Sequence, residues 1–277
     1  MSRLGPCFDE LRSNGRSAFV PFITAGDPDT ETSFEILRKL PEAGADVIEL
    51  GMPFSDPMAD GPAIQASSTR ALGAGMSVKA TLKMVSQFRK ENSKTPIVLM
   101  GYYNPIHAYG VPGFISDAKA AGVDGLIIVD FGPEEDEALR RSANRAGIDI
   151  VRLATPTTDD ARLPTVLNGA SGYLYYVSVA GVTGTKAVPE EDVRAAIKRI
   201  KKSTDLPCAV GFGIRTPEQA EAIAKIADAA IVGSAIVSLI GEADRAGVPR
   251  QKIVSQTIDF CRDLADAVHN ARNQAPA

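Results

Sequence analysis

The chain has 277 residues, an apolar content of 44% and a charged content of 23%, values that suffice for one large α/β domain with a sizeable core. Its formal net charge is -4 and its basic residues form only short clusters such as KRIKK at 198–202, which argues against a nucleic-acid-binding protein. Three widely separated cysteines and two histidines argue against a disulfide framework, a zinc site or a Ser–His relay, so acid–base chemistry is expected from carboxylates.

The start of the chain, MSRLGPCFDELRSNG, has no long apolar stretch, and no later run approaches the roughly 20 apolar residues of a membrane span. We therefore expect no secretory signal and no membrane association. Cysteine usage fits a reducing compartment, and a cytoplasmic protein is the prediction.

Eight short apolar runs alternate with helical stretches along the chain. The motif Ala-Gly-x-Asp recurs where a helix ends and a run begins, and Pro-Glu pairs open three of the helices. The first helix is an addition before the alternation starts. The expected strands are 17–23, 46–50, 96–100, 125–129, 149–153, 173–178, 207–211 and 229–233. The clearest helices are 30–43, 77–91, 134–146, 190–202 and 218–227, with 1–14 as the added helix and 249–268 as the last one.

This alternation, which lacks hairpin signals, predicts a parallel sheet. Eight units in about 250 residues indicate a closed (β/α)8 TIM barrel with an extra N-terminal helix. A doubly wound open sheet is the alternative. No linker or low-complexity segment divides the chain, so we expect residues 1–277 to form a single domain.

An acidic residue, Glu49, interrupts the apolar run 46–50 near its C-terminal end. Chemistry in such a barrel takes place at the C-terminal ends of the strands. If Ile48 and Leu50 pack under the helices, Glu49 points into the barrel mouth, where burial would raise its pKa and make it a proton donor near neutral pH. The structural alternative is an ion pair with an arginine such as Arg152.

The loop after this run, PFSDPMADGP, carries Asp56 and Asp60 between three prolines. Prolines restrict the backbone, so the loop should be stiff enough to hold a carboxylate over a substrate. Turn formation explains the two aspartates equally well.

Glycines follow the last two strands, in VGFGI at 210–214 and IVGSA at 231–235, and Ser234 is placed to cap the short helix that follows. Backbone N–H groups in such loops and at a helix N-terminus bind anions, and these two loops form the usual phosphate site of the barrel class. The segment GVTGTK at 181–186 is placed to close over the same anion. The residues thus indicate a barrel enzyme that acts on a small phosphorylated substrate without a required metal.

The run ELGMPFSDPMADGP closely resembles the signature of the tryptophan synthase alpha chain family, and the resemblance covers nearly the whole chain. The segment DFGPEE at 130–135 departs from the family's pattern. The other matching segments, in the family's order, are PFITAGDP (21–28), GYYNPI (101–106), GVTGTK (181–186), GFGI (211–214) and VGSAIV (232–237).

The resemblance implies a lyase that cleaves indole-3-glycerol phosphate to indole and glyceraldehyde 3-phosphate. It implies that Glu49 is the acid–base residue, that Asp60 accepts the indole N–H and that Tyr175 assists them. Three residues near strand ends would line the indole pocket: Phe22, Met100 and Ile127. The groups implied at the phosphate are Thr183, Gly184, Phe212, Gly213, Gly233 and Ser234.

The resemblance also implies a partner, a tryptophan synthase beta chain that carries pyridoxal phosphate and joins two alpha chains in an alpha–beta–beta–alpha heterotetramer. No cofactor is expected in this chain. Asp56 and the segment YYNP at 102–105, read as a turn, are expected to contact that partner. Two alternatives stay open: a stand-alone lyase that releases free indole, and another phosphosugar-binding barrel enzyme.

Overall fold

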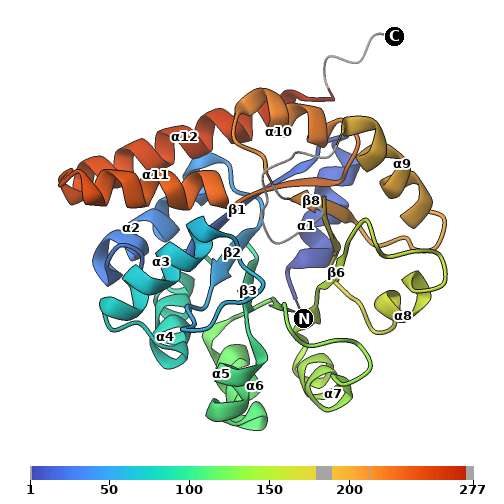
Figure 1. Ribbon diagram of the computed structural model, residues 1–277, viewed down its shortest axis with the longest axis horizontal. Helices are drawn as coiled ribbons and strands as arrows, with labels where there is room; N and C mark the ends of the chain where they lie inside the picture. The colour runs from blue at the N-terminus through green and yellow to red at the C-terminus, as the bar shows by residue number, and fades with distance from the viewer. Residues whose placement is uncertain (1, 179–188, 212, 273–277) are drawn as a thin grey trace.

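The computed structural model describes residues 2–178, 189–211 and 213–272. All strand pairs in these ranges are parallel, in the order β5-β4-β3-β2-β1-β9-β8-β7-β6. Helices surround the strands (Figure 1). The strands are β1 (Ala18–Thr24), β2 (Ile48–Gly51), β3 (Ile97–Gly101), β4 (Gly125–Ile128), β5 (Asp149–Ile150), β6 (Arg152–Ala154), β7 (Leu174–Val177), β8 (Cys208–Gly211) and β9 (Ala229–Val232).

The two strands at the ends of this order, β5 and β6, are halves of one segment that is interrupted at Val151. The first half pairs with β4 and the second half with β7, so residues 149–154 join the two ends of the sheet and close the barrel. The prediction of an eight-unit (β/α)8 barrel is confirmed, with the fifth strand split in two.

The helices alternate with the strands, and the extra N-terminal helix is present as predicted. The described ranges contain no helix with both the length and the apolarity to cross a membrane. The helices are α1 (Leu4–Ser13), α2 (Thr30–Lys39), the short 3-10 helix η1 (Pro41–Ala43), α3 (Pro62–Gly73), α4 (Val78–Arg89), α5 (Tyr103–Tyr109), α6 (Val111–Ala121), α7 (Glu137–Ala146), α8 (Leu163–Leu167), α9 (Glu190–Ile200), α10 (Pro217–Ala224), α11 (Ser234–Arg245) and α12 (Arg250–Asn270).

Side-chain alternation divides the core into two layers. Ile48 and Leu50 of β2 pack with the surrounding helices, whereas Val47 belongs to the cluster inside the barrel. Leu4 and Phe8 of α1 belong to this inner cluster too, so α1 packs against the barrel interior. The side chain of Glu49 is therefore directed inward, toward the opposite, C-terminal mouth, as the alternation predicts.

Helix α7 begins three residues later than the sequence predicts. The expected start at Glu134 rests on the Pro-Glu-Glu signal, but the helix begins at Glu137 after Asp136. Asp136 is buried and binds two arginines, Arg140 and Arg152, so its side chain is directed into the protein at the point where the helix starts. The intervening residues form a longer connection after β4.

Candidate active site

Glu49 is fully buried in β2, with Phe22 of β1 and Val98 of β3 as its neighbours in register. The hydroxyl of Tyr173 donates a hydrogen bond to Oε1 over 2.5 Å, and Oε2 is buried without a partner among the described residues. Burial raises the pKa of Glu49 to about 7, against the lowering effect of the Tyr173 hydroxyl. A carboxyl group with this pKa can both donate and accept a proton near neutral pH.

The structural alternative for Glu49, an ion pair with Arg152, does not occur. Arg152 binds Asp136 instead. Glu49 is held by a neutral phenol, because burial together with the nearby Glu49 charge raises the pKa of Tyr173 well above its usual value. Tyr173 is not among the predicted site residues, although it lies two positions before Tyr175 on the same strand, so both side chains face the barrel interior.

Asp60 is half-buried on the loop between β2 and α3, where Tyr102 donates a hydrogen bond to its Oδ2 over 3.0 Å. The same hydroxyl accepts a hydrogen bond from the Ala59 backbone N–H over 3.0 Å. Burial raises the pKa of Asp60 to about 6, and the Tyr102 hydrogen bond acts in the opposite direction. Tyr102 thus ties both the loop backbone and its carboxylate to the end of β3.

The prediction that YYNP at 102–105 is a turn is wrong. Tyr102 is buried, with 3% of its surface exposed, and Tyr103 begins helix α5. The reason is the position directly after β3, where Tyr102 packs against Phe54 with ring centroids 5.3 Å apart. By contrast, Asp56 is exposed on the loop, and Ser55 donates a hydrogen bond to its carboxylate.

A cavity of about 230 Å³ brings Glu49 and Asp60 to one space at the barrel mouth. Tyr175, the third predicted catalytic residue, lines it too, and among the predicted substrate-binding residues those that line it are Phe22, Met100, Gly213, Gly233 and Ser234. Residues Thr183, Gly184 and Phe212 lie outside the described residues. The lining residues that were not predicted are Ala59, Gly61, Ile64, Val129, Leu153, Thr155, Val177, Ile214 and Ile231.

Ile127 lies deeper than the pocket wall where the resemblance places it. It is fully buried in the inner barrel cluster and does not line the cavity, whereas Val129 does. Residues 127 and 129 share one face of the chain, and 129 is the one beyond the end of β4, nearer the mouth. The prediction therefore gave the correct face of the strand but chose a residue two positions too far from the barrel mouth.

Tyr175 is nearly buried, and its ring packs directly against the backbone of a glycine in β8. A Cβ atom on Gly211 would lie 2.4 Å from the Tyr175 hydroxyl, so a side chain at this position is incompatible with the observed ring. Burial, together with the charges of Glu49 and Asp60, raises the pKa of Tyr175 well above its usual value. The ring therefore faces the cavity as a neutral phenol.

The glycine loops after β8 and β9 present backbone to the same cavity. Gly213 has φ +83°, in the left-handed region that favours glycine, and a Cβ at Gly233 would lie 3.2 Å from Phe22. Ser234 is the first residue of the 12-residue helix α11, and its side chain does not cap that helix, contrary to the prediction. Gly233 and Ser234 line the cavity, and the first N–H groups of a helix have no partner within it, so the N-terminal turn of α11 is suited to an anion.

Among the described residues, no group of His, Cys, Asp and Glu side chains has a geometry that could hold a metal ion. The polar groups that line the cavity include instead two carboxyls of raised pKa, a phenol, the hydroxyls of Thr155 and Ser234, and the backbone of the glycine loops. This set can transfer protons and bind an anion.

A family model described as tryptophan synthase alpha chain matches residues 8–269. The tryptophan synthase subunit alpha of Legionella pneumophila str. Paris is 39% identical, with a TM-score of 0.89 over 97% of this chain and 98% of that one. A protein from Aquifex aeolicus VF5 is 33% identical, with a TM-score of 0.87 over 97% and 100%. Tryptophan synthase from M. tuberculosis, in an aminoacrylate-bound form, is 33% identical, with a TM-score of 0.85 over 97% and 100%. By the family match over nearly its whole length, the chain belongs to the tryptophan synthase alpha chain family.

Proposed function

We propose that this enzyme cleaves indole-3-glycerol phosphate to indole and glyceraldehyde 3-phosphate by a retro-aldol reaction. The observation that carries the proposal is the pair Glu49 and Asp60, two carboxyls of raised pKa that line one cavity. The apolar wall formed by Phe22 and Met100 suits an indole ring.

The reaction moves one proton from a hydroxyl to a ring carbon. Protonated Glu49 delivers its proton to the indole carbon that bears the side chain, which leaves positive charge on the ring nitrogen. Ionised Asp60 accepts the indole N–H and stabilises that charge as it develops. The pKa of about 6 keeps Asp60 largely ionised near neutral pH.

The carbon–carbon bond then breaks, and its electron pair restores the aromatic ring. Glu49, now a carboxylate, takes the proton of the adjacent side-chain hydroxyl, whose oxygen becomes the aldehyde oxygen of glyceraldehyde 3-phosphate. This regenerates the starting protonation state of Glu49. Its pKa of about 7 suits a group that must act as acid and base in turn.

The remaining cavity residues bind the substrate and orient the reacting groups. Tyr173 fixes the direction of the Glu49 carboxyl, and Tyr175 lies against the reacting side chain. Gly213, Gly233 and Ser234 offer backbone N–H groups and one hydroxyl to the phosphate. Thr183, Gly184 and Phe212, outside the described residues, are proposed to complete that site.

We further infer that the chain is one domain, that it uses no cofactor of its own and that it transfers indole to a beta chain that carries pyridoxal phosphate, in a heterotetramer. The tryptophan synthase complex from M. tuberculosis supports the partner. The three free cysteines suit a cytoplasmic location.

The test is to incubate the purified chain with indole-3-glycerol phosphate and to quantify both products, with and without a beta chain. Equimolar indole and glyceraldehyde 3-phosphate are expected, with a faster rate when the beta chain is present. If the folded chain forms neither product in the presence of the beta chain, the proposed reaction is wrong.

A further inference from the structure

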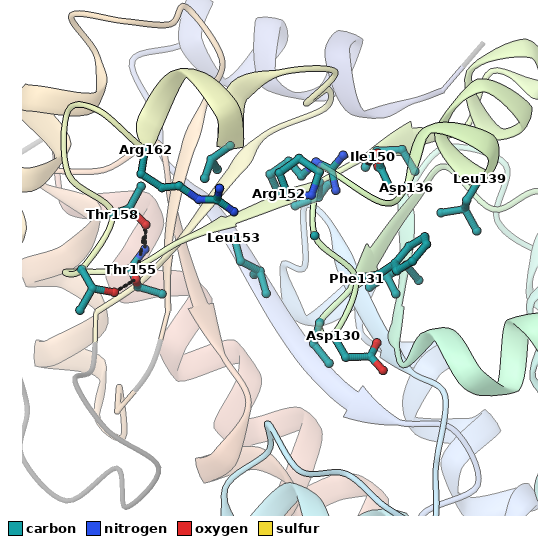
Figure 2. A pocket seen from close by; sticks show the side chains of 17 residues that line it. Asp130, Phe131, Asp136, Leu139, Ile150, Arg152, Leu153, Thr155, Thr158 and Arg162 are labelled. Carbon is teal, nitrogen blue, oxygen red and sulfur yellow. Dashed lines mark hydrogen bonds and ion pairs between the residues drawn. The ribbon is translucent and has the colours of Figure 1, made fainter.

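Buried ion pairs in this barrel differ in the elements that they join. In Figure 2, Arg152 lies beside Asp136 in the wall of a cavity of about 540 Å³, and both residues lie between β4 and the end of β6. The ion pair between Asp27 and Arg70 joins the connection after β1 to helix α3. Arg70 also reaches helix α11, whose first turn is the proposed phosphate site.

The guanidinium of Arg70 is held in place by a buried carboxylate. Its Nε donates to one oxygen of Asp27 over 2.6 Å, and its Nη2 donates to the other oxygen over 2.9 Å. The side chain of Asp27 is 1% exposed and that of Arg70 is 21% exposed. Two parallel charge-assisted hydrogen bonds fix the plane of the guanidinium as well as its position.

Helix α11 has a glycine where this guanidinium approaches it. Gly241 lies in the interior of the helix, a position where glycine is unfavourable. A Cβ atom on Gly241 would lie 2.7 Å from Cζ and from both Nη atoms of Arg70, so a side chain here would collide with the arginine. Nη2 also donates to the backbone carbonyl of Val237, over 3.5 Å. The guanidinium therefore lies directly against the backbone of α11.

Arg70 thus joins two helices that each contribute to the wall of the candidate active site. Helix α3 starts two residues after Asp60 and contributes Ile64 to the cavity, and α11 contributes Ser234. The two helices pack side by side (Figure 1). Their packing sets the separation between the Asp60 loop and the N-terminal turn of α11.

Two partners of Arg70 come from segments on which the family resemblance rests. Asp27 belongs to PFITAGDP and Val237 to VGSAIV. Other residues of these segments line the cavity, but Asp27 and Val237 do not. Their contacts with Arg70 give both residues a place in the support of the site.

We propose that Arg70 is a positioning residue for phosphate binding, which holds the N-terminal turn of α11 in a fixed place relative to the Asp60 loop. The inference rests on the proposed function, because it assigns the substrate phosphate to that turn. Arg70 does not line the cavity and acts through the helix. Backbone N–H groups bind an anion only in a narrow geometry, so a helix shift of about 1 Å weakens phosphate binding.

The experiment measures the binding of glycerol phosphate and of indole, each by calorimetry, to the full-length chain and its variants. Gly241→Ala adds one methyl group, favours the helix and keeps both members of the ion pair, but it forces the guanidinium and the helix apart. Glycerol phosphate binding should weaken at least fivefold, while indole binding changes less than twofold. Glu242→Ala alters the next, exposed side chain of α11 and is the control that should change neither.

A double-mutant cycle tests whether the added methyl group acts through the guanidinium. Arg70→Ala alone should weaken glycerol phosphate binding about as much as Gly241→Ala does. In the double variant the methyl group meets no guanidinium, so Gly241→Ala should add less than a twofold loss to that of Arg70→Ala. Two independent defects would instead multiply. Circular dichroism verifies the fold of each variant, and Gly241→Ala alone decides the outcome if Arg70→Ala does not fold.

The proposal is overturned if folded Gly241→Ala loses less than fivefold in glycerol phosphate binding, if it loses indole binding equally, or if the two losses multiply in the double variant. In these cases the proposed function stands, because the wild type still binds glycerol phosphate. If the folded wild type does not bind glycerol phosphate, the phosphate site of the proposed function is wrong and the positioning role falls with it.

Discussion

Replacing Glu49 by glutamine should remove a pH-dependent destabilisation of the fold. Burial raises the pKa of Glu49 from 4.5 to about 7, so the folded chain keeps this proton over a range in which the unfolded chain has lost it. Below about pH 4.5 the carboxyl is protonated in both states, and the folded chain keeps its full free energy of unfolding. As the pH rises through about 7, the buried group must ionise, and this part of the free energy of unfolding is lost. The difference between 4.5 and 7 corresponds to about 3 kcal/mol, since one pKa unit is worth about 1.4 kcal/mol.

Glutamine retains the shape and can still accept the Tyr173 hydrogen bond, but it does not ionise. The free energy of unfolding, measured by urea denaturation from pH 4 to pH 9, should therefore fall more steeply with pH in the wild type than in Glu49→Gln. The advantage of the variant should grow by about 3 kcal/mol across this range. Glu42→Gln, which alters an exposed carboxylate, is the control and should show no such growth. If the wild-type and Glu49→Gln curves run parallel within about 0.5 kcal/mol, Glu49 is not destabilised by its burial.

Three further predictions concern Asp60, the phosphate loop and the partner. Asp60→Asn should lower kcat about 10²-fold with little change in KM, because the charge that Asp60 stabilises develops only in the transition state; steady-state kinetics that show a change in KM alone would contradict this role. Gly213→Val forces a branched residue to φ +83° and should weaken glycerol phosphate binding about tenfold in calorimetry without affecting indole, whereas equal losses would indicate misfolding. Asp56→Ala, at an exposed position, should reduce the stimulation of indole formation by the beta chain and leave cleavage by the isolated chain unchanged; equal stimulation of wild type and variant would refute the coupling role.

The barrel was predictable from the sequence because its parallel strands are buried on both faces and appear as short apolar runs. The split of the fifth strand at Val151 was not, since it depends on pairing with two different strands. Helix α3 gave no clear signal because its buried positions, Ser67, Ser68 and Ala71, are small or polar. Hydrophobic periodicity, the main helical signal, is weak in such a segment.

At the site, strand alternation gave the inward direction of Glu49, and the resemblance gave Asp60. Neither gave the two tyrosines that bind these carboxylates. The Tyr173–Glu49 contact joins residues 124 positions apart, and the Tyr102–Asp60 contact joins residues 42 positions apart. Their pairing depends on the closure of the barrel, which local sequence patterns do not encode. The distance of a strand residue from the barrel mouth was equally hard to predict from the sequence, as Ile127 illustrates.

The most direct test of the proposed function is a single-turnover experiment on Glu49→Gln with indole-3-glycerol phosphate and the beta chain present. A residue that handles both proton transfers should contribute at or above the usual range for acid–base groups, so the rate of cleavage should fall by about 10³-fold or more. Substrate binding, measured on the same protein, should stay close to that of the wild type. A variant that binds substrate and retains more than about a tenth of the wild-type rate would show that Glu49 does not carry the proton.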